Sequence, residues 1–112
     1  MKQSKNQSKY LFKVLWSKTY IGIAINEKHK ENFDVPLTTF YFWPREEGWK
    51  LLKAELDSKP WIDEKSKIEI LNGYTLILNF WLNTIYKATK TKKPNTKSLP
   101  LNIDIIALNT LN

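Results

Sequence analysis

Residues 36–61, PLTTFYFWPREEGWKLLKAELDSKPW, constrain the fold more than any other stretch, because they hold three of the five tryptophans. Residues 38–43 are β-branched or aromatic, a composition typical of a half-buried strand. Pro44 prevents a central strand from continuing and sets φ for a first helical turn. Large apolar residues then recur at helical spacing, at Trp49, Leu52 and Leu56. The segment therefore predicts a strand, a corner and a helix over about residues 45–57.

Two β-rich runs precede this segment. Residues 10–16 alternate in the manner of a strand, and residues 19–25 carry isoleucine at every second position. The short connection between the two runs predicts a hairpin. Residues 26–35 are charged and loop-like. We therefore expect three strands, the third of them over residues 38–43.

A long amphipathic pattern follows the tryptophan-rich segment. Asp63 is a plausible N-cap, and the helix is predicted to run to about residue 86. One broad apolar face is formed by Ile70, Leu71, Tyr74, Ile77, Leu78, Trp81, Leu82 and Ile85. An uncharged polar stripe lies opposite, at Asn72, Thr75, Asn79 and Asn83. The asparagines would be costly in hydrocarbon, so a helix packed on the sheet explains the pattern better than a membrane span.

These patterns predict an α+β fold, in which a three-stranded antiparallel sheet carries two helices packed on one face. Residues 10–86 form a single domain, preceded by a basic flexible arm at residues 1–9. Residues 87–112 form a basic linker and a C-terminal extension. Its last part, residues 99–111, is apolar again and either docks back onto the domain or adds to a partner. The sequence leaves both possibilities open.

The residues that most enzymes need are scarce. The chain has no cysteine and one histidine, His29, which lies between two lysines and is expected to be solvated. The three glycines are isolated, so there is no phosphate-binding loop. Glu46 and Glu47 are best explained as charges that complement the dipole of the first helix. We therefore expect no enzymatic activity, no cofactor, no metal and no small-molecule substrate.

The formal net charge of +7 is concentrated at the two ends of the chain. Residues 1–35 carry seven lysines and three acids, residues 36–86 six basic residues and seven acids, and residues 87–112 five lysines and one acid. Basic ends suit contact with polyanionic nucleic acid, and the alternative is that they only keep the ends soluble. The candidate RNA-binding residues are Lys2, Lys5, Lys9, Arg45, Lys87, Lys90, Lys92, Lys93 and Lys97.

Arg45 is the only arginine, and three roles remain open for it: a phosphate contact, a pair with Glu46, or stacking on a tryptophan. We expect the tryptophans at the element joins and on the apolar faces to anchor the core rather than to stack on bases: Trp43, Trp49, Trp61 and Trp81. Tyr41 alternates with Phe40 and Phe42, which makes it the better candidate for stacking on an unpaired base.

Two apolar residues do not fit the predicted helix faces. Leu51 lies opposite Trp49 and Leu52, and Phe80 flanks the asparagine stripe. Singly exposed apolar side chains are normal in soluble proteins. Together with the uncharged stripe, Leu51 and Phe80 are instead candidates for a protein-contact surface.

The sequence blocks PLTTFYFWPRE, LKAEL, SKPWI and the later LN…T…NFW closely resemble the plastid-specific ribosomal protein three family of the small ribosomal subunit. The match covers residues 36–81 well and the N-terminal hairpin more loosely. Gly48 and the Gly73-Tyr74 pair depart from the family pattern, and residues 87–112 lie outside it. The resemblance implies a structural component of the chloroplast small ribosomal subunit, bound to ribosomal RNA and adjacent ribosomal proteins. It supplies no residue-level binding map.

The compartment that this resemblance implies agrees with two further observations. Lysine, asparagine and isoleucine, whose codons are AT-rich, are abundant, as in proteins encoded by an organelle genome. Residues 1–9 show no signal or transit peptide pattern, so we expect the protein to work where it is made, with no membrane partner. Two other functions remain open: a free regulatory nucleic-acid-binding protein and a protein-interaction module.

Overall fold

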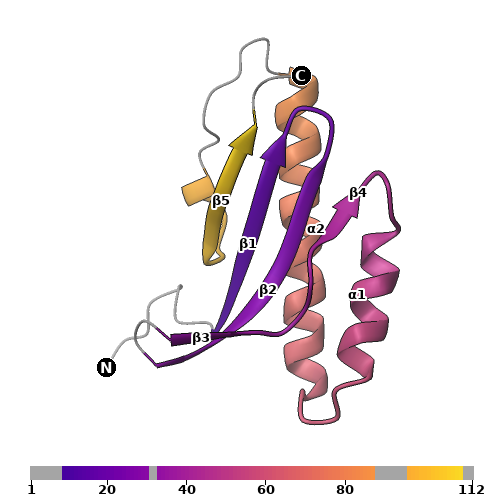
Figure 1. Cartoon of the computed structure of the whole chain (residues 1–112), viewed down its shortest axis with the longest axis vertical. Helices are drawn as coiled ribbons and strands as arrows, with labels where there is room; N and C mark the ends of the chain where they lie inside the picture. Colours follow the sequence, from indigo (N-terminus) through magenta and orange to yellow (C-terminus); the bar gives the residue numbers. More distant parts are fainter. Residues whose placement is uncertain (1–8, 31–32, 88–95, 110–112) are drawn as a thin grey trace.

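A computed structural model describes residues 9–30, 33–87 and 96–109, and it has an α+β architecture (Figure 1). Both helices lie on the same side of one sheet (Figure 1). The elements follow in the order β1 (Tyr10–Ser17), β2 (Ile21–Lys30), β3 (Phe33–Pro36), β4 (Tyr41–Trp43), α1 (Gly48–Asp57), α2 (Glu64–Lys87), the short 3-10 helix η1 (Thr96–Ser98) and β5 (Ile103–Asn109).

The sheet has five strands in the order β3-β2-β1-β5, and β4 also pairs with β2. β1 and β2 form the predicted antiparallel hairpin, with Val14 opposite Ile23. β3 and β4 are both antiparallel to β2, one pairing with its end and the other with its beginning. Between them the hydroxyl oxygen of Thr38 accepts a hydrogen bond from the backbone N–H of Ile25 at 3.1 Å. The chain therefore lines β2 with one interrupted strand.

The predicted three-stranded antiparallel sheet is wrong in two respects. β3 lies in the charged stretch predicted as a loop, and β2 continues to Lys30. A charged run is compatible with an edge strand, because the side chains of such a strand can face water. The second addition is β5, which docks back onto the domain and runs parallel to β1, with Phe12 beside Ile103. A bulge interrupts this pairing between Val14 and Leu15.

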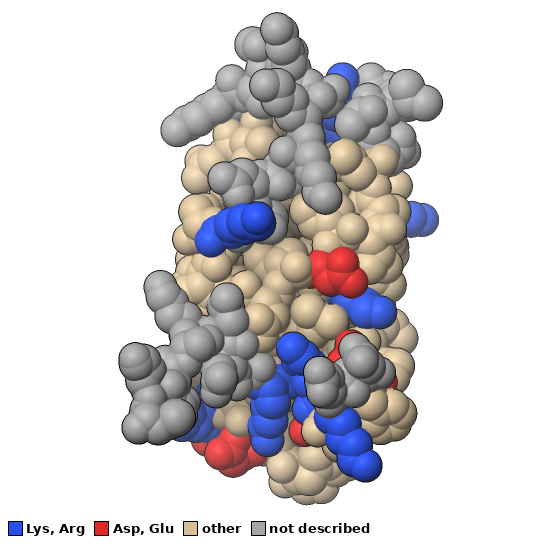
Figure 2. Space-filling model, turned by 90° about the vertical axis from the view of Figure 1, so that its left-hand side faces the viewer, with Lys and Arg blue, Asp and Glu red and all other residues tan. Residues whose placement is uncertain are grey.

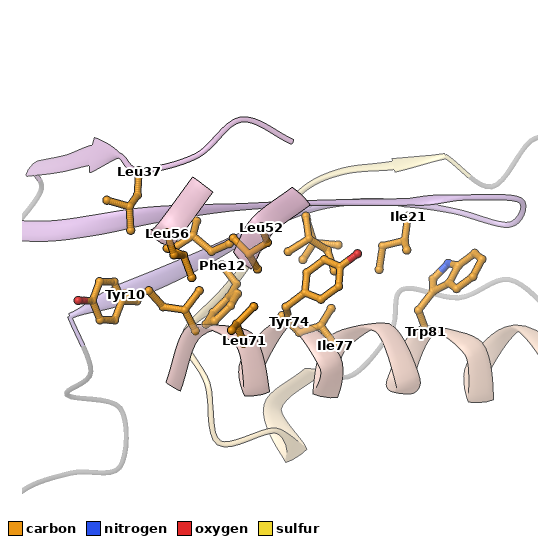
Figure 3. Packing of buried hydrophobic residues seen from close by; sticks show 14 of the residues in the cluster. Tyr10, Phe12, Ile21, Leu37, Leu52, Leu56, Leu71, Tyr74, Ile77 and Trp81 are labelled. Carbon is orange, nitrogen blue, oxygen red and sulfur yellow. The ribbon is translucent and has the colours of Figure 1, made fainter. Parts of the chain in front are cut away.

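The core lies between the sheet and the helices, and the labelled side chains of Figure 3 fill this space. Alternate residues of β1 and β2 point into it, as the strand pattern predicts: Tyr10, Phe12, Val14, Trp16, Ile21, Ile23 and Ile25. Every residue of the predicted apolar face of α2 is either buried or packed against this cluster. The indole N–H of Trp81 donates a hydrogen bond to the carbonyl of Ser17 at 2.8 Å. This bond fixes α2 against the end of β1.

The corner between β4 and α1 differs from the prediction. The Trp43–Pro44 bond is cis, and α1 begins at Gly48 rather than directly after the proline. A side-chain oxygen of Glu46 accepts a hydrogen bond from the backbone N–H of Phe42 at 2.8 Å. Glu46 therefore closes the corner instead of complementing a helix dipole. Glu47 stands at the N-cap of α1 without a side-chain capping bond, and the first turn holds no acid.

The N-cap predicted for α2 is confirmed. The backbone N–H of Ser66 donates to the Oδ1 of Asp63 at 3.1 Å, and the N–H of Lys67 donates to the carbonyl of Asp63. The first bond satisfies one of the N–H groups that a helix start leaves without a partner, and the second is the first regular backbone bond of α2.

Two glycines allow the helices to approach their neighbours closely. A Cβ on Gly48 would lie 2.1 Å from the hydroxyl oxygen of Tyr74, so α1 and α2 can meet here only without a side chain. A Cβ on Gly73 would lie 2.4 Å from the Cζ of Phe12, where α2 crosses β1. Both contacts are shorter than any that real Cβ atoms tolerate.

Candidate nucleic-acid interface

The lysines of the helices and those of the sheet differ in how they are paired. On the helices and in the turn between them, Lys50 pairs with Glu47 at 3.3 Å, Lys53 with Asp57 at 2.9 Å, Lys67 with Asp57 at 3.3 Å, and Lys59 with Glu55. Lys65 of α2 forms no ion pair with a described residue. Within the described ranges, four lysines of the β1–β2 hairpin form no ion pair: Lys13, Lys18, Lys28 and Lys30. Most of the lysines without an ion pair in the described residues therefore lie on the sheet side.

The face of the sheet that points away from the helices, here called the open face, can be built from the strand register. It carries the residues that alternate with the core positions, namely Leu11, Lys13 and Leu15 on β1 and Gly22, Ala24, Asn26 and Lys28 on β2. Two acids share it, since Asp34 stands opposite Lys28 and Asp104 beside Lys13. Seen from the β5 side, basic side chains gather toward the end of the molecule where β1 begins, with acidic side chains among them (Figure 2).

Three aromatic rings, here called the aromatic cluster, lie at the β4 side of the open face: Tyr20, Phe40 and Phe42. The ring centroid of Phe42 is 6.0 Å from that of Tyr20 and 6.2 Å from that of Phe40. Phe42 is opposite Gly22 in the register, and its ring occupies the space that a Cβ on Gly22 would need, 2.5 Å from Cε1. Tyr20 remains 36% exposed.

Tyr41 does not lie on the open face, so it is not the stacking residue that the sequence predicted. As expected from alternation, Tyr41 lies on the sheet face opposite to that of Phe40 and Phe42. That face is the covered one, and the ring of Tyr41 packs against the core. Burial, and after it the negative charge of Glu55 on α1, raises the pKa of the Tyr41 hydroxyl. The pattern gave the alternation correctly, and only the positions of the helices reveal which of the two faces stays open.

Core anchoring is confirmed for two of the four tryptophans and wrong for the other two. The rings of Trp43 and Trp81 meet edge to face with centroids 5.6 Å apart. Trp49 is 43% exposed and Trp61 68% exposed. Leu52 and Leu56 already fill the space beneath α1, and Trp49 instead lines a groove of about 250 Å³ between α1 and α2.

The predicted RNA-binding residues do not form one cluster in the part of the chain that the structure covers. Lys9 is exposed next to β1, with its Nζ 4.0 Å from Glu27 and 5.8 Å from the ring centroid of Tyr10. Lys97 is exposed in η1, and Lys87 is the last residue of α2. The remaining lysines lie outside the described residues: Lys2, Lys5, Lys90, Lys92 and Lys93.

Arg45 is exposed in the corner between β4 and α1. Among the described residues it neither pairs with Glu46 nor stacks on a tryptophan, so two of its three predicted roles are not observed. The phosphate contact stays a prediction.

The two predicted protein-contact residues have different environments. Leu51 is 43% exposed on α1. Phe80 is partly buried, and its ring meets Trp16 edge to face at 6.0 Å. The asparagine stripe is exposed as predicted. Two further exposed apolar residues of α2, Ile68 and Leu76, are 51% and 40% exposed, and each lies about one helical turn from Asn72.

The residues that the structure describes contain neither a membrane span nor a metal-binding group. None of the helices among them is long and apolar enough to cross a membrane. These residues also contain no group of three metal-ligating side chains.

Comparison with known proteins gives one consistent result. Residues 37–84 match the family model described as plastid and cyanobacterial ribosomal protein (PSRP-3/Ycf65). The small ribosomal subunit protein cS23 of Gracilaria tenuistipitata var. liui is 45% identical over 91 residues, which span 78% of this chain and 91% of the relative. The probable cS23 of Synechococcus sp. (strain JA-2-3B'a(2-13)) is 44% identical over 75 residues, 67% of this chain and 75% of the relative. Arabidopsis thaliana cS23z is 36% identical over 75 residues, 67% of this chain and 45% of the relative.

Proposed function

This chain belongs to the plastid and cyanobacterial ribosomal protein family (PSRP-3/Ycf65). We propose that it binds the small ribosomal subunit through electrostatic contacts with RNA on its sheet side and through contacts with a neighbouring protein on its helix side. It is a structural protein of the plastid small ribosomal subunit rather than an enzyme.

The observation that carries the proposal is the unequal pairing of the lysines. A lysine that already pairs with a carboxylate gains little from approaching a phosphate, whereas an unpaired lysine releases counterions when it does so. The unpaired lysines of the β1–β2 hairpin therefore orient the protein with its sheet toward ribosomal RNA. Such contacts position a protein without reading the sequence of the RNA.

The lysine-rich ends of the chain extend the same attraction. Residues 1–9 carry three lysines, and the C-terminal segment carries five. We assign phosphate contacts to Lys2, Lys5, Lys9, Lys87, Lys90, Lys92, Lys93 and Lys97, together with Arg45 in the β4–α1 corner. Since a guanidinium offers a planar fork of donors, Arg45 suits a bidentate phosphate contact.

The helix side suits a neighbouring ribosomal protein. Its charges are largely compensated by pairs within α1 and between α1 and α2. Large apolar side chains stand out of it at Trp49, Leu51 and Ile68, and the uncharged asparagine stripe continues along α2. Exposed aromatic anchors among near-neutral surroundings are typical of protein interfaces.

Sedimentation through a high-salt sucrose gradient tests the proposal. The full chain should travel with small subunits at moderate salt and be released as salt rises. Deletion of residues 1–9, or glutamine at Lys90, Lys92, Lys93 and Lys97, should lower the salt concentration of release while circular dichroism shows an unchanged fold. A protein that stays at the top of the gradient but binds isolated RNA would instead be a free regulator. Unchanged retention of the variants through the salt series contradicts the role of the ends.

A further inference from the structure

We propose that the open face of the sheet holds an unpaired stretch of ribosomal RNA, with one or two bases stacked on the aromatic cluster of Tyr20, Phe40 and Phe42. The proposal rests on the proposed function and names the form of RNA that this face takes.

The first support is the shape of the open face. Gly22 and Ala24 are the small residues of β2 on this face, and both are buried, so a ligand would meet the side chains around them rather than the strand itself. The ring of Phe42 covers Gly22, and the ring centroids of Tyr20 and Phe40 lie 6.0 and 6.2 Å from that of Phe42. Both helices lie on the other side of the sheet (Figures 1 and 3). A planar base can therefore approach the rings without displacing a helix.

The second support is the charge around the rings. Lys18 is exposed in the β1–β2 turn, two residues before Tyr20, and Lys13 lies beside Ala24 on the open face. Lys28 continues the line toward the other end of β2. Asp34 and Asp104 are the acids in register with this face, and neither forms an ion pair with a described residue. Three lysines against two acids leave a positive balance along the length of the strands.

The chemistry distinguishes among the possible occupants. An apolar protein surface would cover the rings but would leave Lys13, Lys18 and Lys28 without compensation. Double-stranded RNA would satisfy the lysines but offers no base face to the rings, because its bases are stacked inside the helix. A single strand satisfies both, since its bases stack on aromatic side chains while its phosphates meet the cations.

Binding of a labelled single-stranded oligouridine to the full chain, measured by fluorescence anisotropy, tests the proposal. Phe42→Leu keeps an apolar group over Gly22 and removes the aromatic face, so the variant should fold and bind about tenfold more weakly. Tyr20→Leu should act in the same direction. Trp49→Leu is the matched control, because it removes an exposed aromatic ring from the helix side and should leave binding unchanged. A hairpin duplex of the same net charge should bind more weakly than the single strand.

The proposal would be overturned by equal binding of duplex and single strand, by unchanged affinity of folded Phe42→Leu and Tyr20→Leu, or by an equal loss in Trp49→Leu. Circular dichroism of each variant identifies a loss of binding that is due to unfolding. Phe42→Tyr keeps an aromatic face and should bind the single strand as the wild type does. Weak binding by folded Phe42→Tyr would also overturn the proposal. If the variants fail to respond while the protein still sediments with small subunits, the stacking proposal fails and the proposed function stands.

Discussion

Gly48 and Tyr74 illustrate how a small residue and a large one meet in one contact. Gly48 is the first residue of α1, and the Tyr74 hydroxyl oxygen of α2 lies where a Cβ on Gly48 would be. Burial, followed by the nearby charge of Glu46, raises the pKa of Tyr74, which is consistent with a hydroxyl enclosed between the two helices. The small residue and the large one are therefore complementary.

Gly48→Ala should destabilise the protein by about 1–3 kcal/mol, because the new methyl group overpacks the contact with Tyr74. In a Tyr74→Phe background the same change should cost less. The missing hydroxyl removes the 2.1 Å contact and leaves the ring carbon Cζ at 3.0 Å. The coupling free energy expected from a double-mutant cycle is about 1 kcal/mol. Urea unfolding of the four proteins measures it, and additive costs would contradict the steric explanation.

At the scale of whole elements, β5 is the strand whose place the sequence least determines. Residues 99–111 are apolar and interrupted, a pattern that fits docking on this domain and docking on a partner equally well. The register resolves this, because Ile103 and Ile105 pair with Phe12 and Val14 and pack on the core cluster, while Ile106 at the bulge is 44% exposed.

Two substitutions one residue apart test whether β5 belongs to the fold. Ile105→Lys places a charge against the core and should destabilise the protein by about 2–4 kcal/mol. Ile106→Lys places the same charge in solvent and should change stability by less than about 0.5 kcal/mol. Thermal unfolding of both variants measures the difference. Equal, small effects would mean that β5 does not contribute to the stability of the domain.

The start of α2 has a pH dependence that its N-cap explains. Hydrogen bonds from the side chain and then from the backbone N–H of Ser66 lower the pKa of Asp63. A carboxylate whose pKa is lower in the folded state stabilises the protein above its unfolded pKa, about pH 4, and that contribution is lost as the pH falls through the folded value.

Asp63→Asn keeps a capping oxygen but cannot ionise, and Asp63→Ala removes the cap. At neutral pH we expect the melting temperature to decrease in the order wild type, Asp63→Asn, Asp63→Ala. As the pH falls below about 4 and then through the lowered pKa of Asp63, the advantage of the wild type over Asp63→Asn should shrink, because the wild-type carboxyl becomes protonated. Melting curves across the pH range measure both effects. A difference between wild type and Asp63→Asn that does not depend on pH would contradict the charge contribution.

Most elements are predictable from local patterns, whereas their mutual arrangement is not. The β1–β2 hairpin, the N-cap at Asp63 and the buried face of α2 all follow from alternation, helical period and capping chemistry. β3 was missed because an edge strand tolerates charge and so lacks an alternating apolar pattern. Trp49 and Trp61 are exposed because size and hydrophobicity predict burial only on average, and the buried positions of α1 beside Trp49 are taken by Leu52 and Leu56.

The candidate interface likewise combines features that local patterns predict with features that depend on how the elements pack together. Lysine counts along the chain predicted a basic protein with basic ends, and ribosomal RNA as its partner follows from the family. Which lysines are free depends on pairs across turns and between helices, such as Lys67 of α2 with Asp57 of α1. Likewise, Phe42 and Tyr41 look equivalent in sequence. They differ only because the helices cover one face of the sheet.

On the scale of the whole molecule, most lysines of the helix side pair with acids, whereas most of those on the β1–β2 hairpin do not. This arrangement predicts that position, rather than number, decides which lysines matter for binding to the subunit. Two triple variants compare the faces, since each removes three lysine charges. The sheet-side variant changes Lys13, Lys18 and Lys28 to glutamine, and the helix-side variant changes Lys50, Lys53 and Lys59 to glutamine.

The sheet-side variant should leave small subunits at lower salt than the wild type, because each lost phosphate contact reduces the slope of log affinity against log salt by about one. The helix-side variant should release at nearly the wild-type salt concentration, since its lysines already pair with Glu47, Asp57 and Glu55. Co-sedimentation across a potassium chloride series measures both slopes, with circular dichroism to confirm folding. If the two variants release together, net charge alone governs association, and the orientation of the sheet toward RNA is wrong.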